Sequence, residues 1–122
     1  MTTETENNPR FKELQSVGAK VVALPADGKT LDLSTVLDYL AQEEINEVLV
    51  ETGSTLSGAF VKAGLVDETI IFMAPKLMGH QGLPLFNLPG LDRMDQNLQL
   101  EIKDLRQLGE DIRIILTNAA DC

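Results

Sequence analysis

The residue types best suited to chemistry lie together where a predicted strand ends and a predicted helix begins. Residues 48–50 form a short apolar, β-rich run, Glu51 follows it directly, and Gly53 lies one residue before Ser54. Ligands of open α/β sheets bind beyond the carboxyl ends of strands. A glycine lets a ligand approach the backbone, and the free N–H groups of a helix start can hold a phosphate with help from the helix dipole. The segment therefore suggests an anion-binding turn.

The donors in such a turn would be the N–H groups of Ser54, Thr55 and Leu56, which lack partners within the helix. The same pattern fits an ordinary strand–turn–helix connection in which Ser54 caps the helix, and the local sequence alone favours this simpler interpretation. The turn has neither the full dinucleotide-binding fingerprint nor a Walker A pattern. Glu51 is either a solvated loop residue or a hydrogen-bond acceptor for a ligand hydroxyl, and the pattern does not decide between the two.

Other polar residues after the third predicted strand carry weaker signals. Lys76 offers a cation to a phosphate, but a solvated lysine at a strand end is the simpler interpretation. His80 is the only histidine and Cys122 the only cysteine, so the sequence indicates neither a metal site nor a Ser-His-Asp arrangement. The loop 83–91 is rich in apolar residues and needs cover. We interpret it as a flap over a ligand or, in preference, as an arm against a partner subunit.

Apolar periodicity predicts an alternation of strands and amphipathic helices that would position these residues. The predicted helices are a short turn with Phe11 and Leu14 before Gly18, a helix over 33–41 capped by Asp32, and a helix over 54–63 stopped by Gly64. The predicted strands are 20–24, 48–50, 69–73, 98–103 and 112–116. The first two are continuous apolar runs typical of buried strands, and the last two alternate around a turn at Gly109. We expect an α/β fold, with a mixed sheet, flanking helices and a C-terminal antiparallel hairpin.

The composition limits the class of protein. The chain has 122 residues, of which 43% are hydrophobic, enough for one domain with a core. Its net charge of −9 argues against nucleic acid and anionic membrane surfaces as partners. Its apolar runs are well short of the roughly 20 residues that a membrane span needs. A single cysteine and a polar start without a secretory signal favour a reducing, cytoplasmic setting.

Seven short motifs occur in a characteristic order. They are 18–21 (GAKV), 31–33 (LDL), 45–53 (INEVLVETG), 63–68 (AGLVDE), 74–79 (APKLMG), 89–91 (PGL) and 108–111 (LGED). Their order and spacing resemble those in the C-terminal half of the reductase domain of the bifunctional riboflavin-biosynthesis deaminase/reductase, and the resemblance covers nearly the whole chain. Each motif is weak alone, but the ordered set is specific.

The resemblance implies a dihydrofolate-reductase-like fold and an NADPH-dependent reductase. In that family, a hydride from NADPH converts the phosphorylated ribose of a phosphoribosylamino-pyrimidine to its ribityl form. The strand-end glutamate of the family, which lies beside the sugar of the substrate, falls on Glu51. The glycine turn and helix start that receive the cofactor fall on Gly53, Ser54, Thr55 and Leu56. Family members usually have Gly or Ala in place of Thr52, and often Pro in place of Ser54.

The resemblance also sets expectations for the chain as a whole. The reductase domain of the family is much longer, so we interpret residues 1–122 as the C-terminal part of a single reductase domain, with residues 1–8 loose. No zinc-binding His/Cys/Cys set is present, so the deaminase is not expected. No residue is identified as the catalytic acid, and no metal is needed. We expect the isolated chain to be inactive and to form a homodimer, because an incomplete sheet leaves edges exposed.

Two alternatives remain open from the sequence. The chain could belong to another dihydrofolate-reductase-like NADPH reductase with a different substrate. It could instead be a non-catalytic dimerisation module whose apolar loop 83–91 mediates assembly. NADPH binding would separate the two reductase interpretations from the dimerisation module.

Overall fold

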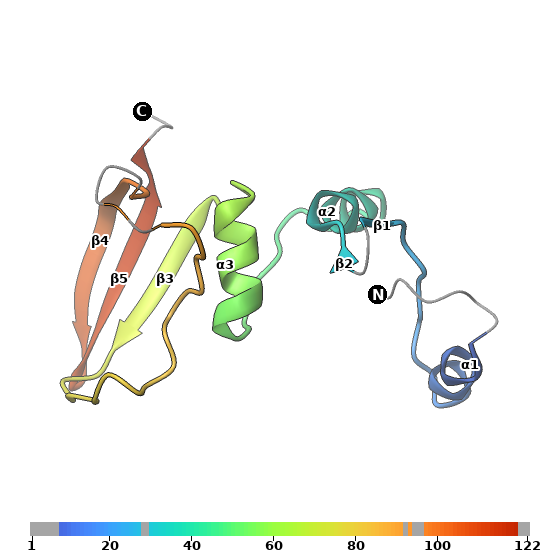
Figure 1. Ribbon diagram of the computed structural model, residues 1–122, viewed down its shortest axis with the longest axis horizontal. Coiled ribbons are helices and arrows are strands. Elements are labelled where there is room, and N and C mark those ends of the chain that lie inside the picture. The colour runs from blue at the N-terminus through green and yellow to red at the C-terminus, as the bar shows by residue number, and fades with distance from the viewer. Residues whose placement is uncertain (1–7, 28–29, 92, 94–96, 120–122) are drawn as a thin grey trace. The chain divides into compact units, whose positions relative to one another are not determined.

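The computed structural model describes residues 8–27, 30–91, 93 and 97–119. The chain divides into two compact units, residues 1–49 and residues 50–122. Figure 1 labels the helices and strands of both units. The predicted loose segment, residues 1–8, lies outside the described residues except for Asn8. Within the described part of the chain, no helix has the length and apolar character that crossing a membrane requires.

The first unit begins with helix α1 (Pro9–Ser16). The Asn8 side chain accepts a hydrogen bond of 2.9 Å from the N–H of Arg10 and so satisfies an amide that the helix leaves without a partner. Phe11 is the buried side chain of α1. Gly18 has a φ of 87°, the left-handed geometry that commonly ends a helix. The predicted helical turn before Gly18 is confirmed.

Helix α2 (Leu33–Gln42) completes the helical part of the first unit. Asp32 caps it, as predicted, and accepts hydrogen bonds from the N–H of Thr35 at 3.1 Å and from the Thr35 hydroxyl at 2.6 Å. These bonds stabilise the ionised carboxylate, so the pKa of Asp32 lies below its usual value.

Two short strands precede α2, namely β1 (Ala26–Asp27) and β2 (Thr30–Leu31), which pair antiparallel. Residues 28 and 29, between β1 and β2, lie outside the described residues. The strand predicted over residues 20–24 is wrong, because only an isolated bridge at Ala23 forms there. A strand of this kind needs neighbours on both sides, and the described residues supply no ladder for it.

The second unit consists of helix α3 (Ser54–Lys62) and a three-stranded sheet. Its strands are β3 (Glu68–Met73), β4 (Leu100–Leu108) and β5 (Asp111–Asn118). They are arranged in the order β3-β5-β4, and both pairings are antiparallel. Figure 1 shows α3 beside β3 and the long connection that leads from β3 to β4. The predicted third strand, the helix before it and the C-terminal hairpin are confirmed.

The strand predicted over residues 48–50, at the boundary between the two units, is wrong. Residues 48–50 form no strand, and their side chains are 44%, 78% and 40% exposed. An apolar strand that is meant to be covered on both faces forms only when neighbouring strands pair with it. The described sheets therefore contain antiparallel pairs alone, and the parallel part of the predicted mixed sheet does not form among the described residues.

Candidate functional site

The predicted anion-binding turn lies in the second unit, where α3 begins. Gly53 is the N-cap of α3, with φ −75° and ψ 166°, and no side chain caps the helix. The carbonyl of Gly53 accepts from the N–H of Ser57 at 3.1 Å. Ser54 is the first helical residue, so the prediction that Ser54 caps the helix is wrong by one position. Because glycine has no side-chain oxygen, the first amides of α3 keep their donor capacity.

The space in front of this turn is open in the described structure. A Cβ atom built on Gly53 meets no other atom within 4 Å. The backbone at this position is extended and suits any residue, so the glycine is not required by the conformation. What the missing side chain does leave is room for a ligand to approach the amides of Ser54, Thr55 and Leu56.

Glu51 lies two residues before the cap and is exposed. Among the described residues it has no hydrogen-bond or ion-pair partner, so its carboxylate is available to accept a bond from a ligand hydroxyl. The structure brings Glu51 and residues 53–56 onto one continuous loop and helix start. Lys76 and His80 lie in the irregular segment after β3 and are exposed, and among the described residues no hydrogen bond or ion pair joins them to Glu51 or to residues 53–56.

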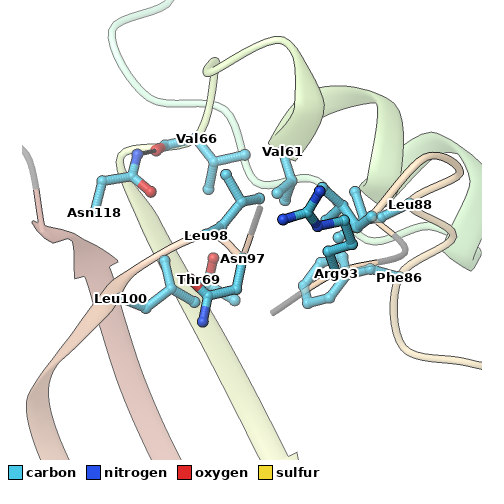
Figure 2. Close-up of a pocket in the computed structure, with 11 residues that line it drawn as sticks. Val61, Val66, Thr69, Phe86, Leu88, Arg93, Asn97, Leu98, Leu100 and Asn118 are labelled. Carbon is cyan, nitrogen blue, oxygen red and sulfur yellow. Dashed lines mark hydrogen bonds between the residues drawn. The ribbon is translucent and has the colours of Figure 1, made fainter. Parts of the chain in front are cut away.

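The second unit also contains a hollow of about 380 Å³ that the sequence did not predict. Figure 2 shows side chains from α3, from the sheet and from the connection between β3 and β4 around it. It is lined by Val61, Val66, Thr69, Phe86, Leu88, Leu91, Arg93, Asn97, Leu98, Leu100 and Asn118. The Asn118 side chain donates to the carbonyl of Val66 at 2.9 Å. None of residues 51–56 lines this hollow, so it is separate from the predicted site.

The apolar loop 83–91 packs in part against its own unit. Phe86 and Leu88 are half-buried, whereas Leu83 and Leu85 are 94% and 58% exposed. The backbone N–H of Asn87 donates to the carbonyl of Ser54 at 2.9 Å, which ties the loop to the first turn of α3. Whether the exposed part of the loop covers a ligand or contacts a partner subunit stays a prediction.

A charged cluster on the sheet was also not predicted. Asp104 bonds to Arg113 at 2.7 Å and to Arg106 at 3.0 Å. The hydrogen bond from Arg113 is the main reason why the pKa of Asp104 lies below its usual value. Arg106 and Arg113 are direct cross-strand neighbours, so the carboxylate offsets the repulsion between two like charges. This cluster stabilises the hairpin.

A second cluster lies in the first unit. Lys20 bonds to the carboxylate of Glu43 at 2.6 Å, and the Tyr39 hydroxyl donates to the same carboxylate at 2.9 Å. These bonds lower the pKa of Glu43, with the bond from Lys20 as the largest cause. All three residues belong to one unit and at least two of them are exposed, so we interpret the cluster as a surface interaction. Across the described residues, no three metal-ligating side chains gather into a possible metal site.

These features define an α/β chain with an antiparallel hairpin and an open, glycine-capped helix start after an apolar segment. The profile of the RibD C-terminal domain family matches residues 1–114. The chain therefore belongs to the RibD C-terminal domain family. This finding confirms the resemblance that the ordered motifs indicated.

Individual relatives agree with this assignment. The chain is 43% identical over 89 residues to the 5-amino-6-(5-phosphoribosylamino)uracil reductase of Buchnera aphidicola subsp. Acyrthosiphon pisum. The aligned residues make up 73% of this chain and 43% of that protein. It is 38% identical over 100 residues to the riboflavin biosynthesis protein RibD of Escherichia coli, and these aligned residues make up 82% of this chain and 27% of that protein. The chain thus spans less than half the length of these curated relatives.

Solved structures support the fold. The chain superposes on form 2 of RibD from Acinetobacter baumannii with a TM-score of 0.79 at 33% identity, over 93% of this chain and 33% of that one. Form 1 of the same protein gives a TM-score of 0.78. The α/β, dihydrofolate-reductase-like fold class is confirmed by these matches, although the parallel strand pairs are not formed among the described residues.

Proposed function

We propose that this chain supplies the cofactor-binding part of an NADPH-dependent 5-amino-6-(5-phosphoribosylamino)uracil reductase of riboflavin biosynthesis. One observation carries the proposal: the start of α3 is open and capped by a glycine, in a chain that belongs to the RibD C-terminal domain family. The name of the Buchnera relative supports the choice of substrate, a phosphoribosylamino-pyrimidine.

The residues present fit a dinucleotide diphosphate at this turn. The amides of Ser54, Thr55 and Leu56 would donate to the phosphate oxygens, and the positive end of the α3 dipole would add to the attraction. Gly53 would let the diphosphate approach, because a Cβ there would occupy space that is now open. The chain has a net charge of −9, so these local donors must outweigh a general repulsion of anions.

Glu51 would orient the substrate beside the cofactor by accepting a hydrogen bond from a sugar hydroxyl. NADPH, when bound, supplies the hydride. The contribution of the protein is to hold the two reactants in the geometry for transfer, which lowers the entropic part of the barrier. No side chain of the described residues is assigned as a proton donor.

The remainder of the site belongs, in this proposal, to the rest of a reductase domain of which residues 1–122 are the C-terminal part. The exposed apolar residues 48–50 support this, because they have the composition of a buried strand without neighbours. We therefore expect no turnover from the isolated chain. We further propose a homodimer, since the outer edges of β3 and β4 pair with no further strand among the described residues, and this and the exposed Leu83 and Leu85 favour association. We also propose a cytoplasmic location, because a single cysteine suits a reducing compartment.

The experiment is a titration of the chain with NADPH, followed by cofactor fluorescence. We expect saturable binding, and we expect Gly53→Val to raise the Kd more than tenfold because its side chain would project where the diphosphate approaches. Gly79→Val is the control, since a Cβ on Gly79 also meets no atom within 4 Å. Equal affinity of a folded Gly53→Val protein would refute the placement of the cofactor. A chain that assembles but does not respond to NADPH would favour a dimerisation module.

A further inference from the structure

Among the glycines that the structure describes, Gly58 has the closest backbone neighbour, at the place where α3 meets the loop 83–91. Gly58 is buried in the middle of α3, and a Cβ built on it would lie 2.9 Å from the carbonyl carbon of Asn87 and even nearer to the oxygen. Real Cβ atoms essentially never come this close to a backbone atom. Glycine is unfavourable inside a helix, so a glycine here is explained by the close approach of the loop.

A hydrogen bond holds the two segments together at the same place. The N–H of Asn87 donates to the carbonyl of Ser54 at 2.9 Å. Ser54 and Gly58 are four residues apart on α3, so they lie on the same side of the helix. The neighbours of Asn87 in sequence, Phe86 and Leu88, are half-buried and line the hollow beside Val61 of α3. Three successive residues thus fix the loop on the helix.

The hydrogen bond between Asn87 and Ser54 involves the same peptide group as the Thr55 amide of the proposed cofactor site. The carbonyl of Ser54 and the N–H of Thr55 belong to the same planar peptide unit. A hydrogen bond accepted by the carbonyl polarises the unit and makes its N–H a stronger donor. It also fixes the orientation of that N–H. The Asn87 bond therefore acts on a donor that points toward the anion site.

We propose that Gly58 and Asn87 are positioning residues for cofactor binding: together they dock the loop 83–91 onto α3 so that the Thr55 amide is oriented and polarised toward the diphosphate. This inference rests on the proposed function and adds to it a role for the loop. Because binding couplings are reciprocal, an anion at the amides must in turn strengthen the bond between Asn87 and Ser54.

The test uses the isotope-labelled chain and inorganic pyrophosphate as the probe, with backbone amide shifts followed by NMR. In the wild-type chain we expect saturable shifts at Ser54, Thr55 and Leu56. Gly58→Ala should raise the Kd for pyrophosphate about fivefold, a coupling of the usual size. Gly79→Ala adds the same methyl group in open space and should leave the Kd unchanged.

The outcomes separate this inference from the function on which it rests. Wild-type binding with an unchanged Kd in folded Gly58→Ala overturns the role of the loop and leaves the cofactor site intact. No shifts at residues 54–56 of the wild type would overturn both. If Gly58→Ala does not fold, hydrogen exchange of the Asn87 amide in the wild type decides: slower exchange with pyrophosphate supports the coupling, and unchanged exchange overturns it.

Discussion

Replacing Gly53 by aspartate should move stability and cofactor affinity in opposite directions. Asp is a better N-cap than Gly, the backbone at Gly53 is already extended as an N-cap requires, and a Cβ there meets no atom within 4 Å. The new carboxylate would accept from the first amides of α3, and its charge would be favourable at the positive end of the helix. The same carboxylate would occupy the donors that we assign to the diphosphate.

The two effects have magnitudes that can be measured. The better cap and its charge should raise the free energy of unfolding by about 0.5–1 kcal/mol. The repulsion between the carboxylate and one phosphate charge about 5 Å away is about 3 kcal/mol at an effective dielectric constant of about 20. The Kd for NADPH should therefore rise by roughly two orders of magnitude, and the rise should shrink as salt screens the charges.

Gly53→Asn is the matched control, because asparagine caps a helix about as well as aspartate without adding charge. Urea unfolding and NADPH titration of the wild type and both variants make up the assay. We expect both variants to gain stability, and Gly53→Asp to lose much more affinity than Gly53→Asn. If Gly53→Asp gains stability and binds NADPH as tightly as the wild type, the amides at the start of α3 do not bind the diphosphate.

Two further predictions concern stability. Phe60 is 7% exposed, so Phe60→Ala should lower the free energy of unfolding by about 3 kcal/mol. Phe72 is 65% exposed, so Phe72→Ala should change the free energy of unfolding by less than about 0.5 kcal/mol. Equal losses of stability for the two variants in urea unfolding would contradict this prediction. Asp104 has a lowered pKa, so its bond to Arg113 contributes stability above the unfolded-state pKa of about 3.9, and this contribution is lost as the pH falls through the lower folded-state value. The stability difference between the wild type and Asp104→Asn should therefore be largest near neutral pH and shrink in acid, and a difference that does not change with pH would count against the ion pair.

The elements that the sequence predicted correctly are those whose signals are local. Asp32 caps α2 because its side chain reaches amides two and three residues ahead, and Gly64 ends α3 with a φ of 68°. The alternation of apolar and polar residues on either side of Gly109 predicts a hairpin, because its two strands are neighbours in sequence and need no other partner. In each case, the residues that determine the element lie within it or beside it.

The wrong strand predictions concern segments whose partners are not local. Residues 20–24 and 48–50 have strand composition, but composition does not supply a neighbouring strand, and a ladder requires one. The one-residue error at the start of α3 has another cause. Gly53 and Ser54 are both common N-cap residues, and only the backbone conformation shows which of them stands outside the helix.

That one-residue difference changes how the candidate site is interpreted. A capping serine would have satisfied an amide of α3 with its own hydroxyl, and the simpler interpretation of an ordinary connection would have accounted for the turn. With Gly53 at the cap, no side chain of the described residues accepts a hydrogen bond from the first amides of α3, so water or a ligand must do so. Water can do so at an exposed helix start. The family assignment is what favours a diphosphate, and Gly53→Asp tests that choice because it fills the donors without disturbing the fold.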